Sequence, residues 1–247
     1  MSQRNLLPFV LLAGGALVAL MAAGGSSPSI AGEGDLATEG TAAGLNWTER
    51  LVGGLEPGQP APMLIVFHGR GGDPDRMADK FLGLGVPARV IAPTGPARVG
   101  GNPAWWTLRS TTQDQAKLVG DMSEVAAMLG AFMAELRGIK PTLGRPVLAG
   151  HSQGGMAALA TQQRDPSSVA HAVAGSAWLP PELAAHRNTR TTLIHGEQDD
   201  VVPFERTAEL AQALGLPLSS VPGAGHSLSG ALEDAIVDAA RSAVSAV

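Results

Sequence analysis

The stretch Val147-Leu-Ala-Gly-His-Ser-Gln-Gly-Gly-Met156 (VLAGHSQGGM) joins a short apolar run to a serine that has a glycine two positions away on each side. The run from Val147 to Ala149 is typical of a buried strand, and the alanine-rich residues after Gly154 are typical of a helix. A strand that turns directly into a helix through Gly-x-Ser-x-Gly is the context of a nucleophile elbow, in which the turn exposes the serine hydroxyl. Because the chain contains 32 glycines, the pattern could also arise by chance. The rest of the sequence has to decide between the two readings.

The composition of the chain indicates a globular α/β protein. Of its 247 residues 45% are hydrophobic and 16% are charged, which suits one well-filled core rather than a disordered chain. The formal net charge is −5 and no run of Lys and Arg occurs, so we expect no nucleic-acid partner. Cysteine is absent, which excludes disulfides, thiolate metal sites and cysteine nucleophiles.

The N-terminal region has the order of an export signal. Arg4 precedes the apolar run Leu6 to Ala23, and small residues follow. We predict a signal peptide or N-terminal anchor at residues 1–31, a flexible linker at 32–45 and one α/β domain at 46–247. The protein is therefore expected to be exported, to the periplasm or the medium. An uncleaved anchor, which would be its sole contact with a membrane, is the alternative.

From Asn46 onward, short apolar runs alternate with helical patterns. We predict strands at Asn46–Val52, Met63–Phe67, Ala88–Ala92, Pro146–Gly150, Val169–Ala174, Thr191–His195 and Leu218–Val221. We predict helices at Gly154–Arg164, Phe204–Leu214 and Ala231–Val247, and a long one that begins with a capping box of Thr112 and Gln115 and ends at Gly138. Alternating strands and helices predict a mostly parallel sheet with helices on both faces, and chemistry collects at the carboxyl ends of its strands.

A serine nucleophile needs an oriented base, and the chain has six histidines. His226 lies in VPGAGHSL, a loop after the last predicted strand, where an α/β hydrolase keeps its base. We therefore assign His226 as the base of Ser152. We expect His151 to point away from its neighbour Ser152. For the remaining four, we expect packing or hydrogen-bonding roles: His68, His171, His186 and His195.

The acid that orients the base should follow a strand between Ser152 and His226 in the chain. The stretch Leu193 to Pro203 (LIHGEQDDVVP) has three candidates, namely Glu197, Asp199 and Asp200. We choose Asp199 and keep Asp200 as the alternative. The same cluster could bind a metal or form a solvated acidic loop, and we expect no metal site.

The Gly-rich loop Phe67 to Asp73 (FHGRGGD) follows another predicted strand. It lacks the Lys-Ser/Thr of a phosphate-binding loop, and a His-Gly-x-Gly-Gly loop is the expected source of an oxyanion N–H. We assign the backbone N–H groups of Arg70 and Gln153 to an oxyanion hole.

Three tryptophans are candidates for the walls of a substrate pocket. Trp105 and Trp106 follow the Ala88–Ala92 strand, and Trp178 follows the Val169–Ala174 strand, so all three come after the carboxyl end of a predicted strand. Packing in the core is the alternative for each of them.

With these residues in place, the chain resembles the phospholipase/carboxylesterase family of α/β hydrolases, which includes acyl-protein thioesterases. The resemblance is carried by GHSQGG (150–155), FHGRGGD (67–73), SAWLP (176–180), HGEQDDVVP (195–203) and GAGHSL (223–228). It implies an α/β-hydrolase fold with little or no lid, and a serine hydrolase that acts on esters or thioesters without metal or cofactor. The spacing from Ser152 to His226 is short for this family, which implies trimmed loops and a shallower pocket.

We therefore predict a serine esterase with Ser152, Asp199 and His226 as its triad and a small-molecule ester as its substrate. Within enzymes, the same triad could serve a peptidase, a lactonase or a polyester depolymerase. From another class, a non-catalytic binding protein with this fold is the alternative.

Overall fold

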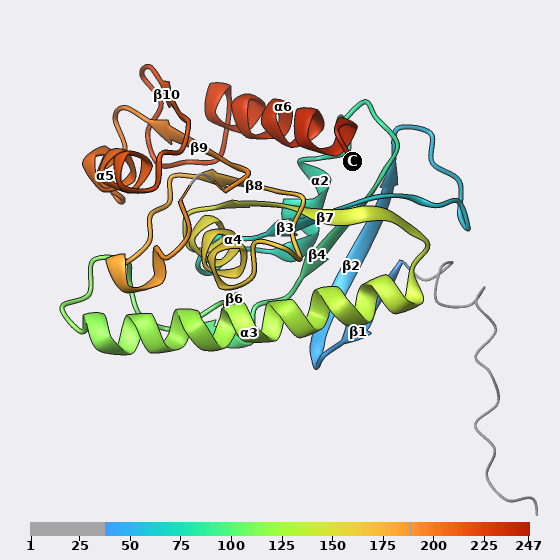
Figure 1. Ribbon diagram of the computed structural model, residues 1–247, viewed down its shortest axis with the longest axis horizontal. Coiled ribbons are helices and arrows are strands. Elements are labelled where there is room, and N and C mark those ends of the chain that lie inside the picture. The colour runs from blue at the N-terminus through green and yellow to red at the C-terminus, as the bar shows by residue number, and fades with distance from the viewer. Residues whose placement is uncertain (1–37, 188) are drawn as a thin grey trace, which may run out of the picture. The chain divides into compact units, whose positions relative to one another are not determined.

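The computed structural model describes residues 38–187 and 189–247 of the chain, which lie in one compact unit (Figure 1). The predicted signal peptide or anchor at 1–31 and the first part of the predicted linker lie outside the described residues. The last part of that linker is not a flexible segment, because Glu39–Ala42 forms strand β1. The main chain of β1 pairs antiparallel with β2. The folded domain thus begins before residue 46.

In the described residues, eight strands form one sheet in the order β1-β2-β4-β3-β7-β8-β9-β10. After β1, its strands are β2 (Leu45–Val52), β3 (Ala61–Phe67), β4 (Ala88–Pro93), β7 (Thr142–His151), β8 (His171–Gly175), β9 (Thr191–Gly196) and β10 (Leu218–Val221). Strands β4, β3, β7, β8, β9 and β10 run parallel, and β1 and β2 are antiparallel at one edge. The predicted mostly parallel sheet is confirmed.

Helices cover both faces of this sheet (Figure 1). They are α2 (Pro74–Asp79), α3 (Gln115–Ile139), α4 (Gln153–Arg164), α5 (Phe204–Leu214) and α6 (Ala231–Ser245). Short α2 was not predicted, nor was the hairpin of β5 (Ala97–Val99) and β6 (Asn102–Ala104). A turn of 3-10 helix spans Pro181–Leu183.

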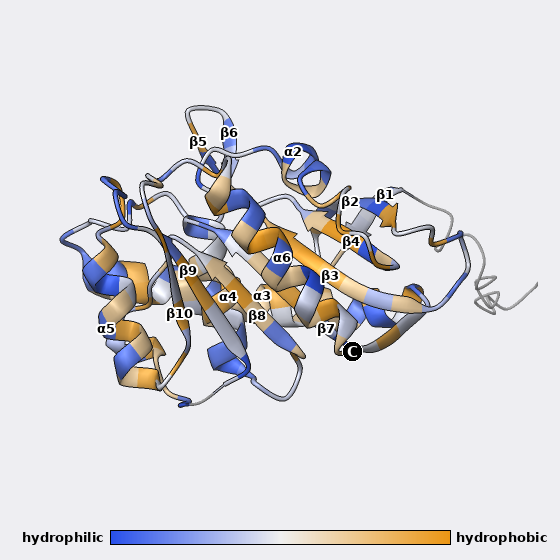
Figure 2. Ribbon diagram, turned by 90° about the horizontal axis from the view of Figure 1, so that it is seen from above, coloured by the Kyte–Doolittle hydropathy of each residue, from blue (hydrophilic) through white to orange (hydrophobic). Residues whose placement is uncertain are grey.

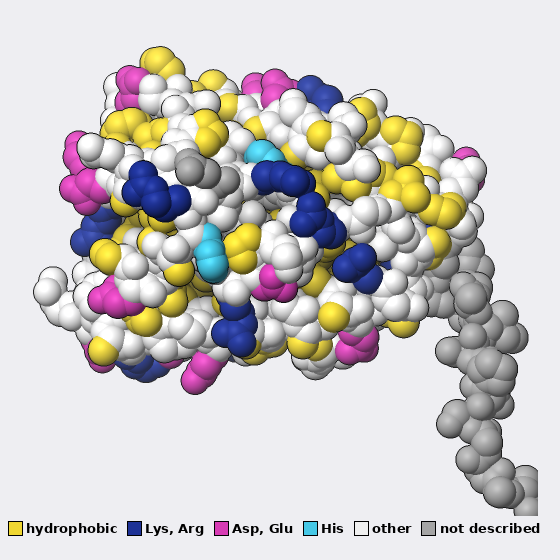
Figure 3. All heavy atoms as spheres, viewed as in Figure 1, with side chains coloured by type: hydrophobic (Ala, Val, Ile, Leu, Met, Phe, Trp, Pro, Cys, Tyr) yellow, Lys and Arg dark blue, Asp and Glu magenta, His cyan; other side chains and the backbone are white. Residues whose placement is uncertain are grey.

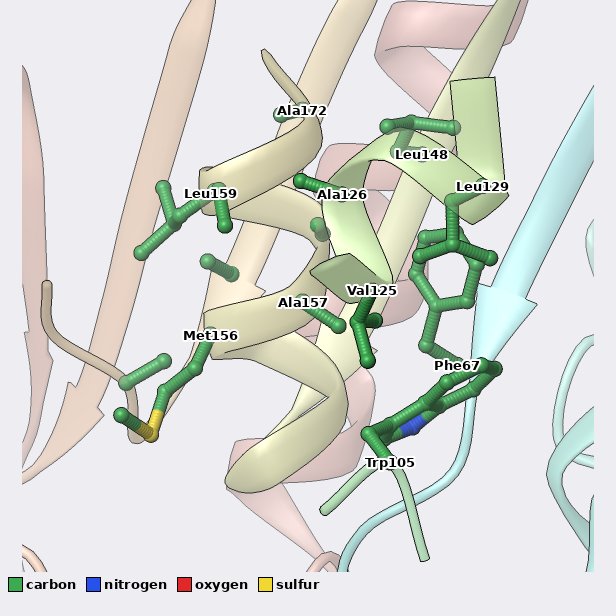
Figure 4. Packing of buried hydrophobic residues seen from close by; sticks show 14 of the residues in the cluster. Phe67, Trp105, Val125, Ala126, Leu129, Leu148, Met156, Ala157, Leu159 and Ala172 are labelled. Carbon is green, nitrogen blue, oxygen red and sulfur yellow. The ribbon is translucent and has the colours of Figure 1, made fainter. Parts of the chain in front are cut away.

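Two hydrophobic cores lie on the two faces of the sheet, and β3 contributes to both. Met63, Ile65 and Phe67 pack with residues of α3, α4 and α5, whereas Leu64 and Val66 pack with residues of α2 and α6. Successive side chains of a strand point to opposite faces, so the continuous apolar run of β3 fills both cores. Figure 2 shows the apolar colour concentrated on the central strands, while α5 and α6 carry both apolar and polar residues. Figure 4 shows the first core, with Phe67 and Trp105 below α3.

The N-terminus of α3 differs from the prediction. The side chain of Asp114 accepts a hydrogen bond from the N–H of Lys117 at 3.0 Å and caps the helix. The predicted capping box is wrong, because the Gln115 side chain donates to the carbonyl oxygen of Thr112 instead. An aspartate directly before the first helical residue satisfies one of the free N–H groups there.

Figure 3 shows one face of the molecule, on which Lys and Arg side chains gather with histidines among them. Two surface hollows share Arg145 and Arg190 in their walls. No serine lines either of them, so neither offers a serine nucleophile. Among the described residues, no helix is long and apolar enough to cross a membrane.

Candidate active site

Ser152 lies on a strained turn between β7 and α4. Its backbone has φ 56° and ψ −123°, a conformation that side-chain-bearing residues rarely adopt. The turn is fixed because the N–H of Ser152 donates to the carbonyl oxygen of Gly175 at 2.9 Å. A Cβ atom on Gly150 would lie 2.4 Å from the backbone of Gly154, so a side chain does not fit there. The sequence pattern Gly-x-Ser-x-Gly therefore forms the expected elbow geometry.

The structure brings His226 and Asp199 to this serine. The Nε2 atom of His226 lies 3.0 Å from Oγ of Ser152. On the other side of the ring, Nδ1 lies 2.8 Å from Oδ2 and 3.0 Å from Oδ1 of Asp199. Since the carboxylate only accepts, Nδ1 carries the proton and donates it, and Nε2 of the neutral ring is left to accept the hydroxyl proton of Ser152.

The turn after β9 holds Asp199 as an anion. Its side chain is fully buried, and Oδ1 accepts the N–H groups of Val201 at 2.9 Å and Val202 at 2.8 Å. Burial alone would raise the pKa of this carboxyl. The hydrogen bonds from His195, His226 and Val202 outweigh it and hold the pKa of Asp199 well below its usual range.

The neighbouring acidic residues Asp200 and Glu197 are not the partners of His226. Asp200 is exposed and lines the cavity beside the serine, and Glu197 is exposed and accepts a hydrogen bond from Ser220. Of the three acidic candidates, Asp199 is the one that contacts His226. Among the described residues, no three His, Asp or Glu side chains are grouped to hold a metal ion.

Arg70 and Gln153 line the cavity beside Ser152, and their backbone N–H groups have no hydrogen-bond partner in the described part of the chain. Arg70 lies in the loop after β3, and its N–H group donates to no residue there. Gln153 is the first residue of α4, where N–H groups have no acceptor within the helix. These are the two donors that were predicted from the sequence to form an oxyanion hole.

The side chain of Gln153 ties α4 to the loop after β6. Its Oε1 accepts the N–H of Trp105 at 2.9 Å, and its Nε2 donates to the carbonyl oxygen of Trp106 at 2.9 Å. The loop after β3 is tied to the same region, because Nε1 of Trp105 donates to the carbonyl oxygen of His68. The Nε2 atom of His68 accepts the N–H of Gly95 at 3.0 Å, and burial lowers the pKa of this histidine. His68 therefore has the packing and hydrogen-bonding position that was expected of it.

A cavity of about 590 Å³ opens beside Ser152 and His226. Its apolar wall consists of Trp106, Leu108, Met156 and Val201, and its charged residues are Arg70, Arg109 and Asp200. Trp105 and Trp178 do not line it, contrary to the sequence interpretation. Trp105 is buried between Phe67 and His68, and Trp178 lies under the guanidinium of Arg206 at 4.4 Å. Both indoles complete the core instead.

His151 does not point away from the site, which corrects the expectation for this residue. Its ring lies 4.9 Å from the ring of His226, and it lines the cavity. Burial, and then the neighbouring His226, lower the pKa of His151 to about 3, so this ring is neutral at neutral pH. The orientation of the His151 ring could not be predicted from residue spacing, because the unusual backbone angles at Ser152 determine where the adjacent side chain points.

The comparisons with known proteins identify the family and the fold. A family model described as phospholipase/carboxylesterase matches residues 55–234. No curated protein sequence matches the chain. Among solved structures, esterase PE8 is 25% identical with a TM-score of 0.66, over 80% of this chain and 98% of that one. The carboxylesterase of Bacillus cereus is 18% identical with a TM-score of 0.65, over 81% and 94%. Acyl-protein thioesterase 2 of Zea mays is 20% identical with a TM-score of 0.58, over 79% and 98%.

Proposed function

The chain belongs to the phospholipase/carboxylesterase family of α/β hydrolases, and we propose that it is a serine esterase in which Ser152, His226 and Asp199 form the catalytic triad. The observation that carries this proposal is the continuous hydrogen-bonded chain from Oγ of Ser152 through both ring nitrogens of His226 to Asp199. Such a chain is what a serine nucleophile needs, because the hydroxyl is a weak nucleophile until a base removes its proton.

In the first step of the proposed reaction, Nε2 of His226 takes the proton of Ser152 as Oγ attacks the ester carbonyl carbon. The N–H groups of Arg70 and Gln153 donate to the oxygen that becomes negative, and the partial positive charge at the start of α4 supports them. The anion of Asp199 stabilises the imidazolium that forms on His226. The same imidazolium then protonates the leaving alcohol, which leaves an acyl group on Ser152.

In the second step, water replaces the alcohol. His226 removes a proton from the water, the hydroxide attacks the acyl carbonyl, and the same two N–H groups stabilise the negative oxygen. Collapse of this intermediate breaks the bond to Oγ and returns the proton to Ser152. Each N–H donor in such a site is typically worth roughly 10²–10³ in rate.

A direct experiment tests this proposal. The full chain is assayed with p-nitrophenyl esters of increasing acyl length, and Ser152→Ala is expected to lower kcat by at least about 10⁴-fold with unchanged thermal unfolding. Mass spectrometry after treatment with a fluorophosphonate probe is expected to find the label on Ser152. Full esterase activity in Ser152→Ala would contradict the triad, and a folded protein that takes up no label would favour a non-catalytic binding role.

The triad alone does not select the leaving group. Thioesters, lactones, peptides and polyesters contain carbonyl groups that the same residues could attack, and a panel of these compounds distinguishes the alternatives. The cavity of about 590 Å³ is in the size range of small-molecule sites, which favours a small ester over a folded protein substrate.

A further inference from the structure

His195 is a second imidazole on the carboxylate of Asp199, in addition to that of His226. It ends β9 and is fully buried. Its Nε2 atom lies 3.2 Å from Oδ2 of Asp199 and 2.9 Å from the carbonyl oxygen of Val202. Its Nδ1 atom lies 2.7 Å from Oγ1 of Thr207 in α5. Both ring nitrogens therefore face oxygen atoms at hydrogen-bond distance.

The hydroxyl of Thr207 decides which way the bond to Nδ1 runs. A threonine hydroxyl has one proton, and Oγ1 of Thr207 lies 2.8 Å from the carbonyl oxygen of Ala177, which can only accept. The proton of Thr207 therefore points to Ala177, and Oγ1 presents a lone pair to His195. For this contact to be a hydrogen bond, Nδ1 of His195 has to carry a proton.

The opposite nitrogen, Nε2, also faces oxygen atoms that can only accept a hydrogen bond. The carbonyl oxygen of Val202 has no proton, and Asp199 is ionised because its hydrogen bonds hold its pKa well below the usual range. Nε2 of His195 therefore also has to be a donor. A neutral imidazole has one N–H, whereas the imidazolium has two.

We propose that His195 is a buried imidazolium that is bonded to Thr207 on one side and to Val202 and the carboxylate of Asp199 on the other. A buried cation is tolerated when an opposite charge and hydrogen bonds compensate it, and the anion of Asp199 is 3.2 Å away. The ring of Phe204 packs edge-on against that of His195, with the two ring centroids 5.6 Å apart.

For the esterase reaction proposed above, on which this role rests, His195 acts as a positioning residue. It shares Oδ2 of Asp199 with Nδ1 of His226, so it helps to fix the carboxylate that orients the base. It also sets the local charge. The titratable groups that face this pair are His226 from the loop after β10 and the neutral His151 from the end of β7. A positive charge at His195 opposes a second one at His226.

The protonation of His195 can be measured without turnover. We expect NMR spectra of the full chain, with ¹⁵N-labelled histidine, to show one ring with N–H groups at both nitrogens at neutral and mildly alkaline pH. These signals should disappear in His195→Gln, which assigns them. A His195 ring with one bare nitrogen at neutral pH would overturn the proposal, whether or not the protein cleaves esters.

Thr207 gives a second variant that leaves His195 in place. Thr207→Val removes the acceptor of Nδ1, so we expect the ring to lose one of its two N–H signals above neutral pH. Thr207→Ser keeps the hydroxyl and is expected to keep both signals. Equal spectra for the two variants would contradict the proton count.

The pH dependence of kcat/KM tests the positioning role. In His195→Gln, we expect the midpoint of the acidic limb to move up by about one pH unit, because the opposing positive charge is gone. KM is expected to change less than twofold. His171→Gln is the matched control, since His171 is bonded to Thr192 at the other end of β8. An unchanged midpoint in a folded His195→Gln would overturn the role, and if that variant does not fold, Thr207→Val is expected to move the midpoint in the same direction.

Discussion

A Cβ atom on Gly154 would lie 2.0 Å from the carbonyl oxygen of Phe67, so the first turn of α4 touches the backbone of β3 directly. This approach places Ser152 beside the loop that carries Arg70. We expect Gly154→Ala to lower the free energy of unfolding by about 3 kcal/mol, because neither backbone can give way. The misplaced elbow should also lower kcat by at least about 100-fold.

Gly130 is the matched control for this substitution. It lies in the middle of α3, and a Cβ atom there would meet no atom within 4 Å. Gly130→Ala is expected to raise the free energy of unfolding by about 0.5–1 kcal/mol, because alanine is the better helix former. Urea denaturation of both variants checks the pair. A wild-type midpoint and rate for Gly154→Ala would contradict the close approach.

The two adjacent aspartates should differ sharply in their effect on turnover. Asp199→Asn removes the acceptor that keeps the proton on Nδ1 of His226, and the ring can then adopt the wrong tautomer. We expect kcat to fall by roughly 10⁴-fold, as the loss of such an orienting carboxylate does in other serine hydrolases. Asp200→Asn, whose carboxylate is exposed, is expected to lower kcat by less than about tenfold. If Asp200→Asn had the larger effect, Asp200 would be the orienting acid.

The stability of the protein should depend on pH through His151. Its pKa is about 3 in the folded protein and about 6.5 in the unfolded chain. Between these two pKa values the His151 side chain binds a proton in the unfolded chain but not in the folded protein. The stabilisation is fully present above pH 6.5 and is lost as the pH falls towards 3, by at most about 1.4 kcal/mol per pH unit.

Urea denaturation at pH 7.5 and pH 5 measures this dependence. The free energy of unfolding of His151→Gln should change by about 2 kcal/mol less between these two pH values than that of the wild type. His186→Gln, at an exposed histidine, serves as the control and should keep the wild-type dependence. Equal dependences for wild type and His151→Gln would mean that this ring is not excluded from protonation.

Trp106 should determine how well bulky esters bind. It lines the cavity next to Ser152 and Met156. Trp106→Ala is expected to lower kcat/KM for aryl and longer acyl esters by about tenfold or more, while acetate esters change less. Trp106→Phe should retain most of the rate, and Leu82→Ala, at a side chain that is 55% exposed and outside the cavity, should have no effect. A uniform loss for all esters would point to a displaced Gln153 rather than to lost substrate contacts.

Much of the fold could be predicted because its central strands are continuous apolar runs. The run Met63–Phe67 and the start of the elbow at Val147 needed no further information. The strand β1 could not be predicted, because Glu-Gly-Thr-Ala has no apolar pattern and pairs through its main chain. Its turn is further fixed by the N–H of Ala43, which donates to Glu135 of α3 at 2.8 Å.

The positions of the candidate site residues followed from strand ends, because the carboxyl ends of parallel strands meet at one edge of a sheet. Which way side chains point there did not follow. His195 reaches Asp199 because the chain turns between them, where the N–H of Asp199 donates to the carbonyl oxygen of Gly196 at 3.2 Å. Trp178 is covered by Arg206, a residue of α5 that lies far along the chain. Both contacts depend on tertiary packing that residue spacing does not encode.

Ser152 and His226 are 74 positions apart and follow β7 and β10, while Asp199 follows β9. A ribosome that has produced the chain past Asp199 but not yet His226 has made the nucleophile and the acid but no base. On the proposed mechanism, turnover of a chromogenic ester during refolding or synthesis therefore begins only after the outermost strand has joined the sheet. The onset of colour would therefore report when β10 and the loop that carries His226 have reached the sheet.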